Sequence, residues 1–137
     1  MKAFVLDCSL TMAWCFEDEQ TEQSQALLER LAHDEAVAPS LWALEVTNVL
    51  LVAERRGRLT AARAEGFAAV LKRLPITVSD ASPSGTFDRV LPLARSLGLS
   101  AYDASYVELA LSLGLPLASL DRRLIEAANR LGVVTLP

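Results

Sequence analysis

The stretch Ala3-Phe4-Val5-Leu6-Asp7 opens the chain with a short apolar run that ends at an acidic residue. A continuous apolar run of this length is typical of a strand buried on both faces, as in a parallel sheet. Ligands of open α/β folds bind where the parallel strands end. This stretch therefore predicts a buried strand with Asp7 as a candidate functional residue at its carboxyl end.

The same alternation of short apolar runs and helical patterns continues to the end of the chain. Further strands are predicted at 36–38, 76–78, 116–120 and 133–135, and helices at 9–16, 21–32, 41–56, 60–74, 82–97, 100–113 and 122–131. Pro92 lies inside one helical pattern and predicts a kink or a break there. The alternation predicts an α/β fold, a three-layer sandwich with a mainly parallel central sheet flanked by helices. With 137 residues, one domain over 1–137 is expected.

Composition excludes several classes of protein. The chain is 52% hydrophobic, which excludes a disordered protein, yet no apolar run approaches the ~20 residues of a membrane span. The net charge of -4 argues against a protein that holds nucleic acid by bulk charge, but a bound metal would reverse the local field. The single histidine, His33, excludes sites built on histidine pairs. Cys8 and Cys15 form no metal or redox motif, and without a secretory signal a cytoplasmic protein is predicted.

Three acids lie at junctions between predicted elements. Asp7 and Asp121 each follow a strand, and Asp103 lies in the first turn of the helix predicted at 100–113. Each has a second interpretation as a helix-capping residue, because aspartate is favoured at N-caps and Ser100-x-x-Asp103 has the spacing of a capping box. Capping and a shared functional site both stay open for these three.

Glu45 lies within the helix predicted at 41–56, which is apolar nearly all round and is therefore expected to be mostly buried. A buried carboxylate is costly unless it is paired, hydrogen-bonded or bound to metal. The alternative is a narrow solvent stripe that Glu45 shares with Thr47 and Asn48.

If these four acids converge at the edge of the sheet, their charges repel one another and raise one another's pKa values. A hard divalent cation resolves that conflict, and an all-carboxylate site points to Mg²⁺ or Mn²⁺. The chemistry that follows is metal-assisted phosphoryl transfer or phosphodiester hydrolysis.

Four motifs carry a resemblance to a known family. They are Val5-Leu6-Asp7-Cys8-Ser9, the helical segment 44–50 with Glu45 and Asn48, the segment 100–110 with Asp103, and Leu117-Ala118-Ser119-Leu120-Asp121 with the residues up to 124. In order and spacing, over essentially the whole chain, they resemble the PIN-domain ribonucleases, and among these the VapC-type toxins of bacterial toxin-antitoxin pairs. Ser119 stands where the family usually has threonine, which keeps a hydroxyl.

The resemblance implies a PIN-like fold and an Mg²⁺- or Mn²⁺-dependent endoribonuclease. It implies that the catalytic and metal-binding residues are Asp7, Glu45, Asp103 and Asp121, and that Ser9, Asn48 and Ser119 support them or position water. Arg122 and Arg123, next to Asp121, are candidates for contacts with RNA phosphates, with a solvated helix start as the alternative.

The resemblance also implies partners: an RNA substrate, a cognate VapB-type antitoxin and a second copy in a homodimer, with no membrane. It suggests that some of Trp14, Phe16 and Trp42 line a groove for an antitoxin segment, although core packing is the more frequent fate of such side chains. Three alternatives remain: a PIN nuclease of RNA processing that is not a toxin, a PIN-fold binding module without catalysis, and a receiver-like or phosphatase-like Mg²⁺ domain. The last would require a second aspartate after the first strand, where Cys8-Ser9 stands, or a lysine near the site.

Overall fold

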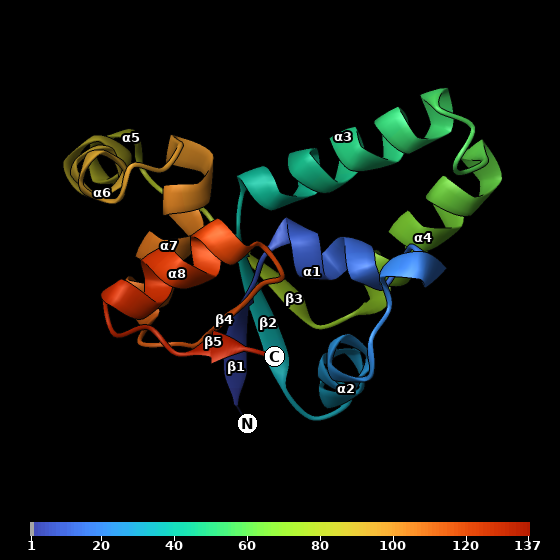
Figure 1. Cartoon of the computed structure of the whole chain (residues 1–137), viewed down its shortest axis with the longest axis horizontal. Coiled ribbons are helices and arrows are strands. Elements are labelled where there is room, and N and C mark those ends of the chain that lie inside the picture. The colour runs from blue at the N-terminus through green and yellow to red at the C-terminus, as the bar shows by residue number, and fades with distance from the viewer. Residues whose placement is uncertain (1) are drawn as a thin grey trace.

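A five-stranded sheet forms the centre of the molecule in the computed structural model, which describes residues 2–137. The strands are β1 (Ala3–Leu6), β2 (Glu35–Pro39), β3 (Ile76–Ser79), β4 (Leu117–Ala118) and β5 (Thr135–Leu136). They lie in the order β3-β2-β1-β4-β5, and each neighbouring pair is parallel (Figure 1). The predicted parallel sheet is confirmed.

Helices account for most of the remaining chain. They are α1 (Cys8–Ala13), a short 3₁₀ turn η1 (Glu17–Glu19), α2 (Glu22–Arg30), α3 (Leu41–Arg55), α4 (Ala61–Arg73), α5 (Pro83–Gly85), a π-helical turn η2 (Thr86–Val90), α6 (Leu91–Leu97), α7 (Ala101–Leu113) and α8 (Arg122–Arg130). Pro92 lies in the first turn of α6, directly after the π-helical turn. The helix predicted at 82–97 is therefore interrupted next to its proline, as expected.

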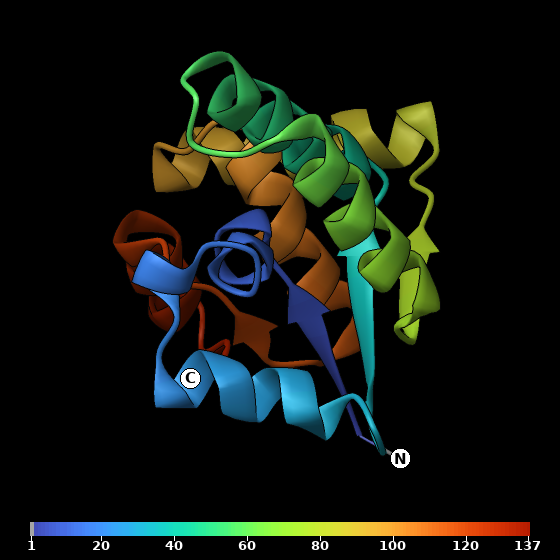
Figure 2. The same ribbon diagram turned by 90° about the vertical axis from the view of Figure 1, so that its right-hand side faces the viewer.

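The helices cover the two faces of the sheet in two groups. Along the chain, β1, β2 and β3 are added in one direction, and the chain then returns to place β4 and β5 on the other side of β1. Because crossovers between parallel strands are right-handed, reversing the direction moves the connecting helices to the opposite face. Figure 1 shows α1 to α4 on one side of the sheet and α5 to α8 on the other, and Figure 2 shows α3 and α4 running side by side. This is the predicted three-layer arrangement.

The last strand begins two residues later than predicted. Val133 is buried, but its N–H donates to the carbonyl of Ala128 in α8, so it belongs to the turn that ends that helix. Gly132 precedes it with φ +78°, a conformation that glycine adopts without steric cost. The apolar pattern of 133–135 is therefore shared between a helix-ending turn and a short strand.

The structure bears on two expectations about burial. The α3 helix is not mostly buried: Leu44 is 74% exposed and Leu51 is also exposed, because only one face of the helix packs against the molecule. Trp14, Phe16 and Trp42 are all part of the hydrophobic core, the more frequent fate expected for them, and Trp42 also lines a surface pocket. The Trp14 indole N–H donates to the backbone oxygen of Ser24 at 2.8 Å, and the Trp42 indole N–H donates to Thr11 Oγ1 at 2.9 Å.

The core begins with β1. Phe4, Val5 and Leu6 have no exposed surface, which confirms a strand covered on both faces. Among residues 2–137, no helix is long and apolar enough to cross a membrane.

Candidate acidic site at the carboxyl end of the sheet

The point where the sheet reverses its direction of growth lies between β1 and β4. These two strands are parallel neighbours, with Leu6 opposite Ala118, so the residues that follow them leave the sheet side by side. Asp7 follows β1, and Ser119 and Asp121 follow β4. In open α/β sheets the crevice at such a switch point is where ligands bind. The fold thus brings two of the four predicted acids to the expected edge.

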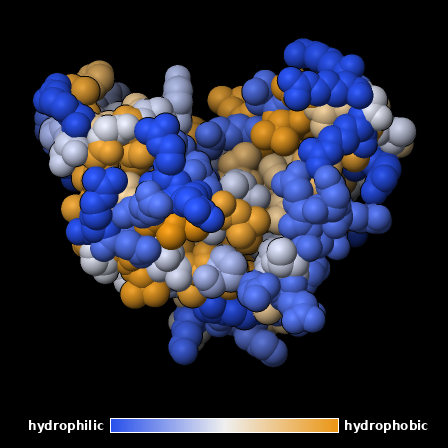
Figure 3. All heavy atoms as spheres, viewed as in Figure 1, coloured by the Kyte–Doolittle hydropathy of each residue, from blue (hydrophilic) through white to orange (hydrophobic). Residues whose placement is uncertain are grey.

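All four predicted acids line one open hollow at this edge, with a volume of about 470 Å³. Asp7 comes from the β1–α1 junction, Glu45 from α3, Asp103 from the first turn of α7, and Asp121 from the start of α8. Figure 3 shows the molecular surface notched between the α5–α8 side and the α3–α4 side, with hydrophilic residues on both sides of the notch.

Asp7 is the most buried of the four, with 5% of its surface exposed. Its side chain makes no capping hydrogen bond to α1, so the capping interpretation does not describe it. Instead Oδ2 accepts hydrogen bonds from Ser9 Oγ at 2.5 Å and from Ser119 Oγ at 2.7 Å. Burial raises the pKa of Asp7, the two serine hydroxyls lower it in part, and the charge of Asp103 adds to the increase. Both serines that the sequence singled out beside Asp7 therefore hydrogen-bond to its carboxylate.

Glu45 is half-buried, and its Oε1 accepts a hydrogen bond of 2.5 Å from the hydroxyl of Tyr106 in α7. Burial raises the pKa of Glu45, the Tyr106 hydroxyl lowers it, and the charges of Asp7 and Asp103 raise it further. Sequence reasoning did not single out Tyr106. The available signal was its position three residues after Asp103, which places both side chains on one face of the same helix.

Asp103 and Asp121 keep part of their surface exposed. The Ser100 hydroxyl accepts a hydrogen bond from the backbone N–H of Asp103, which is one half of the predicted capping box. Asp121 does cap α8, because its Oδ1 accepts hydrogen bonds from the backbone N–H groups of Arg123 and Leu124. Burial raises the pKa of Asp103, as does the charge of Asp121, while Arg123 lowers it. Capping and a place in the hollow are therefore compatible for Asp121.

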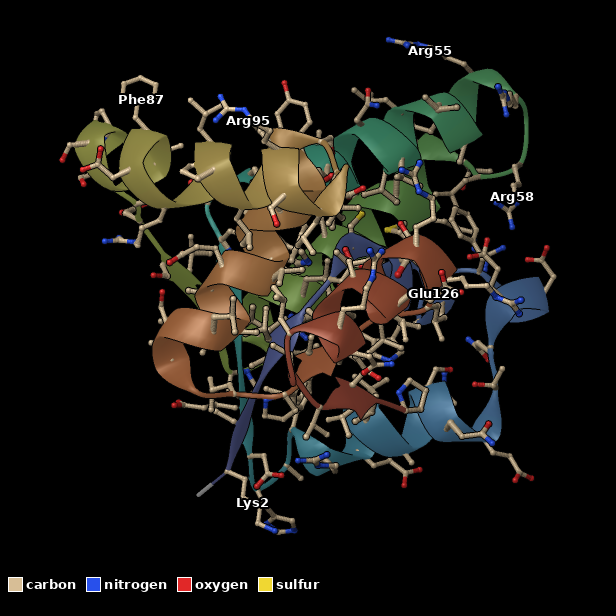
Figure 4. All side chains as sticks on the ribbon, turned by 60° about the vertical axis from the view of Figure 1, so that its left-hand side comes forward. Lys2, Arg55, Arg58, Phe87, Arg95 and Glu126 are labelled. Carbon is tan, nitrogen blue, oxygen red and sulfur yellow. The ribbon has the colours of Figure 1, made fainter. Side chains whose placement is uncertain are left out.

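One edge of the hollow carries a contact that the sequence did not reveal. Arg58 lies in the loop between α3 and α4 with its guanidinium carbon 3.8 Å from the centre of the Phe16 ring. It donates to Asp18 at 2.9 Å and to Glu19 at 2.8 Å, and Glu19 also lines the hollow. In Figure 4 Arg58 points toward this turn, whereas Arg55 points away from the molecule. The contact ties η1 to the α3–α4 loop beside the acids.

Some predicted residues lie elsewhere. Asn48 is exposed and does not line the hollow, because the face of α3 that carries it points to solvent. Arg122 and Arg123 are exposed at the start of α8, where Arg123 donates to the backbone oxygen of Gly98 at 3.2 Å. Phe16 lines the hollow with one edge while remaining buried.

The charges of the four acids are not neutralised by basic side chains. Within residues 2–137, none of the four forms an ion pair with lysine or arginine. Carboxylate oxygens are the ligands that Mg²⁺ and Mn²⁺ prefer, so the donor set fits a hard divalent cation. Among the described residues, no three histidine, cysteine, aspartate or glutamate side chains lie close enough together to hold a metal ion as they stand. Adjacent Cys8 offers no thiolate, because burial and the charges of Glu45 and Asp7 raise its pKa to about 12.

A parallel sheet with carboxylates around its switch point defines a class of α/β domains suited to binding a cation and a phosphate. The sequence matches the PIN domain over residues 4–130, and the chain belongs to the PIN domain family. It is 31% identical over 122 residues to Ribonuclease VapC3 of Pyrobaculum aerophilum, a match that covers 89% of this chain and 92% of that protein.

Two solved structures extend the comparison. A crystal structure of a Pyrobaculum aerophilum protein superposes with a TM-score of 0.75 at 27% identity, covering 98% of this chain and 83% of that one. VapBC2 from Rickettsia felis, bound to a DNA fragment from its promoter, gives a TM-score of 0.70 at 9% identity, covering 97% of this chain and 96% of the matched chain. At that identity the Rickettsia structure shows a shared fold.

The strand order excludes one alternative that the sequence left open. A receiver-like domain has the strand order 2-1-3-4-5. The order here is β3-β2-β1-β4-β5, with two further strands on one side of β1 rather than one. The receiver-like interpretation therefore does not describe this protein.

Proposed function

We propose that the protein is a divalent-cation-dependent endoribonuclease and the toxin of a toxin-antitoxin pair, acting as one domain over residues 1–137. The observation that carries the proposal is the hollow at the β1–β4 switch point, which four carboxylates from four separate elements line in a chain of the PIN domain family. The name of the Pyrobaculum relative, a ribonuclease of the VapC type, supports RNA as the substrate and a toxin as the biological role.

The residues proposed to hold the cation are Asp7, Glu45, Asp103 and Asp121. Mg²⁺ or Mn²⁺, when bound there, supplies charge neutralisation for a phosphate and lowers the pKa of an attacking water. Ser9 and Ser119 keep Asp7 oriented through their hydrogen bonds to Oδ2. A carboxylate of the hollow that is not fully engaged by the cation would accept the proton of the water.

The electrostatics of the hollow also favour a cation. Asp7, Glu45 and Asp103 each have a raised pKa, in part because neighbouring carboxylates repel them. A divalent ion held by these residues would offset this repulsion. Arg122 and Arg123, exposed at the start of α8 next to Asp121, would contact RNA phosphates.

Two protein partners belong to the proposal. A cognate VapB-type antitoxin restrains the nuclease, and two copies of the chain form a homodimer. Support for the antitoxin is the VapC-type relative together with the shared fold of the Rickettsia toxin-antitoxin complex. Trp14 and Trp42 are largely buried, although Trp42 also lines a pocket between α3 and α4.

The test is cleavage of a labelled single-stranded RNA by the purified protein. Cleavage should require Mg²⁺ or Mn²⁺ and stop when EDTA is added. Asp7→Asn and Asp103→Asn should abolish it, because each removes a charged oxygen ligand while preserving the size of the side chain. Asp88→Asn, which changes an exposed aspartate in η2 outside the hollow, is the matched control and should cleave normally. RNA cleavage by Asp7→Asn at the wild-type rate would overturn the proposal.

A further inference from the structure

Tyr106 is a wholly buried tyrosine whose hydroxyl reaches the acidic hollow. None of its surface is exposed, and it lies in α7 three residues after Asp103. Its hydroxyl donates to Oε1 of Glu45 in α3, 61 positions earlier in the chain, at 2.5 Å. A helix on one side of the sheet thus contacts, through a single hydrogen bond, an acid carried by a helix on the other side.

The hydrogen bond restrains a side chain that has little else to hold it. Glutamate has several rotatable bonds, and the described residues provide Glu45 with neither an ion-pairing cation nor a second hydrogen-bond donor. Tyr106 is rigid because it is packed in the core, so its hydroxyl has one position available. The contact occupies one oxygen of Glu45 and leaves the other oxygen free.

We infer that Tyr106 is a positioning residue: its hydroxyl fixes one oxygen of Glu45 so that the other oxygen faces the cation of the acidic hollow. The inference rests on the proposed function, since it assumes that Glu45 is a ligand. Outer hydrogen bonds of this kind orient metal ligands in proteins and restrict their rotamers before the metal arrives. The burial of Tyr106 explains why the hydroxyl is reliable in this role, because water does not compete for it.

The first experiment measures cation binding without RNA, so that it does not depend on catalysis. Mn²⁺ binding is followed by electron paramagnetic resonance for the wild type, Tyr106→Phe and Tyr102→Phe. Tyr102 is the matched control, because it lies one turn earlier in the same helix and is 65% exposed. Tyr106→Phe should weaken Mn²⁺ binding by about tenfold or more, and Tyr102→Phe should bind as the wild type does.

A double-mutant cycle separates positioning from general loss of structure. In a Glu45→Ala background the Tyr106 hydroxyl has no carboxylate to orient, so adding Tyr106→Phe should change Mn²⁺ affinity by less than about twofold. A Tyr106→Phe effect that is as large in this background as in the wild type would overturn the inference, because it would then act through the fold. Circular dichroism and urea denaturation establish that each variant is folded.

A second measurement uses the wild-type side chain and does not require Tyr106→Phe to fold. The chain has only two tyrosines, so Tyr102→Phe assigns the Tyr106 signal in protein labelled with ¹³C at the tyrosine Cζ. Titration with Mg²⁺ should shift this signal, and the shift should be half complete at the Mg²⁺ concentration that half-saturates the site. The shift should disappear in Glu45→Ala.

The outcomes for the two proposals are distinct. Mn²⁺ binding that is weakened by Glu45→Ala but not by Tyr106→Phe, with a Tyr106 signal that Mg²⁺ leaves unchanged, would overturn the positioning role and leave the metal site standing. A wild-type protein that binds neither cation would overturn the proposed site and the positioning role together.

Discussion

Ser119 Oγ donates a hydrogen bond of 2.7 Å to Oδ2 of Asp7, joining two side chains that are 112 positions apart in the chain. The contact exists because β1 and β4 are parallel neighbours and end at the same level of the sheet. Ser119 is wholly buried, and Asp7 is nearly so. A buried carboxylate depends on such donors, since it has lost most of its water.

Replacing Ser119 by alanine should therefore destabilise the protein. The substitution removes one of the two hydroxyls that donate to Asp7, and we expect the free energy of unfolding to fall by about 1–3 kcal/mol at neutral pH. Urea denaturation in EDTA measures the change. Ser112→Ala is a suitable control, because Ser112 is exposed and bonds only to Glu108 in α7. Equal stability of Ser119→Ala and the wild type would mean that the hydrogen bond does not support Asp7.

Stability without cations should depend on pH through Asp7. Burial raises the pKa of Asp7 above its ordinary 3.8, so the folded state retains a proton that the unfolded state has released. Asp7 therefore destabilises the folded state only above pH ~4, where the unfolded state has released its proton. This loss of stability increases with pH until the pH passes the raised pKa. Asp7→Asn should gain stability over the wild type as the pH rises from about 4 to about 7.

Asp34 provides the control of opposite sign. A hydrogen bond from Arg30 lowers the pKa of Asp34, so its stabilising contribution is present above its ordinary pKa and is lost as the pH falls. Asp34→Asn should therefore reduce stability at neutral pH and have little effect in acid. Urea denaturation at a series of pH values in EDTA measures both variants. If the free energy of unfolding of wild type and Asp7→Asn changed with pH in the same way, burial would not be raising the pKa of Asp7.

Trp42 should act as a core residue. Trp42→Phe keeps an aromatic ring but removes the hydrogen bond to Thr11 Oγ1, and we expect a loss of about 1–3 kcal/mol in the free energy of unfolding. The exposed Phe87 in η2 provides the comparison, and Phe87→Ala should stay within about 0.5 kcal/mol of the wild type. Both values come from urea denaturation. A Trp42→Phe protein as stable as the wild type would disagree with the packing of the indole.

Two glycines should respond in opposite ways to alanine. Gly66 lies inside α4 with open space where a Cβ would stand, so Gly66→Ala should stabilise the protein by about 0.5–1 kcal/mol. Gly114 ends α7 with φ +65°, a left-handed conformation that costs alanine about 1–2 kcal/mol. The two melting temperatures, compared with that of the wild type, should shift in opposite directions. A shift of both in the same direction would contradict the helix geometry.

Local features of the fold were predictable because their causes lie within a few residues. Thr60 and Ser100 accept hydrogen bonds from backbone groups three residues later, and these caps begin α4 and α7 where expected. Pro92 interrupts its helix for a reason contained in its own ring. The last strand was misplaced because Val133 has the apolar character of a strand residue but donates its N–H to the end of α8.

The sequence by itself determined the alternation of strands and helices and singled out four acids, three at element junctions and Glu45 inside a helix, because apolar runs, caps and short motifs record these locally. Only the tertiary structure decided which face of α3 is covered, leaving Leu44 exposed and Glu45 directed to the hollow. It alone brought Tyr106 to Glu45 and Ser119 to Asp7, since these contacts depend on the packing of elements far apart in the chain. Hydrogen bonds of this kind leave no periodic pattern in the sequence, because their geometry is set by the order of the strands and by the faces that the helices bury.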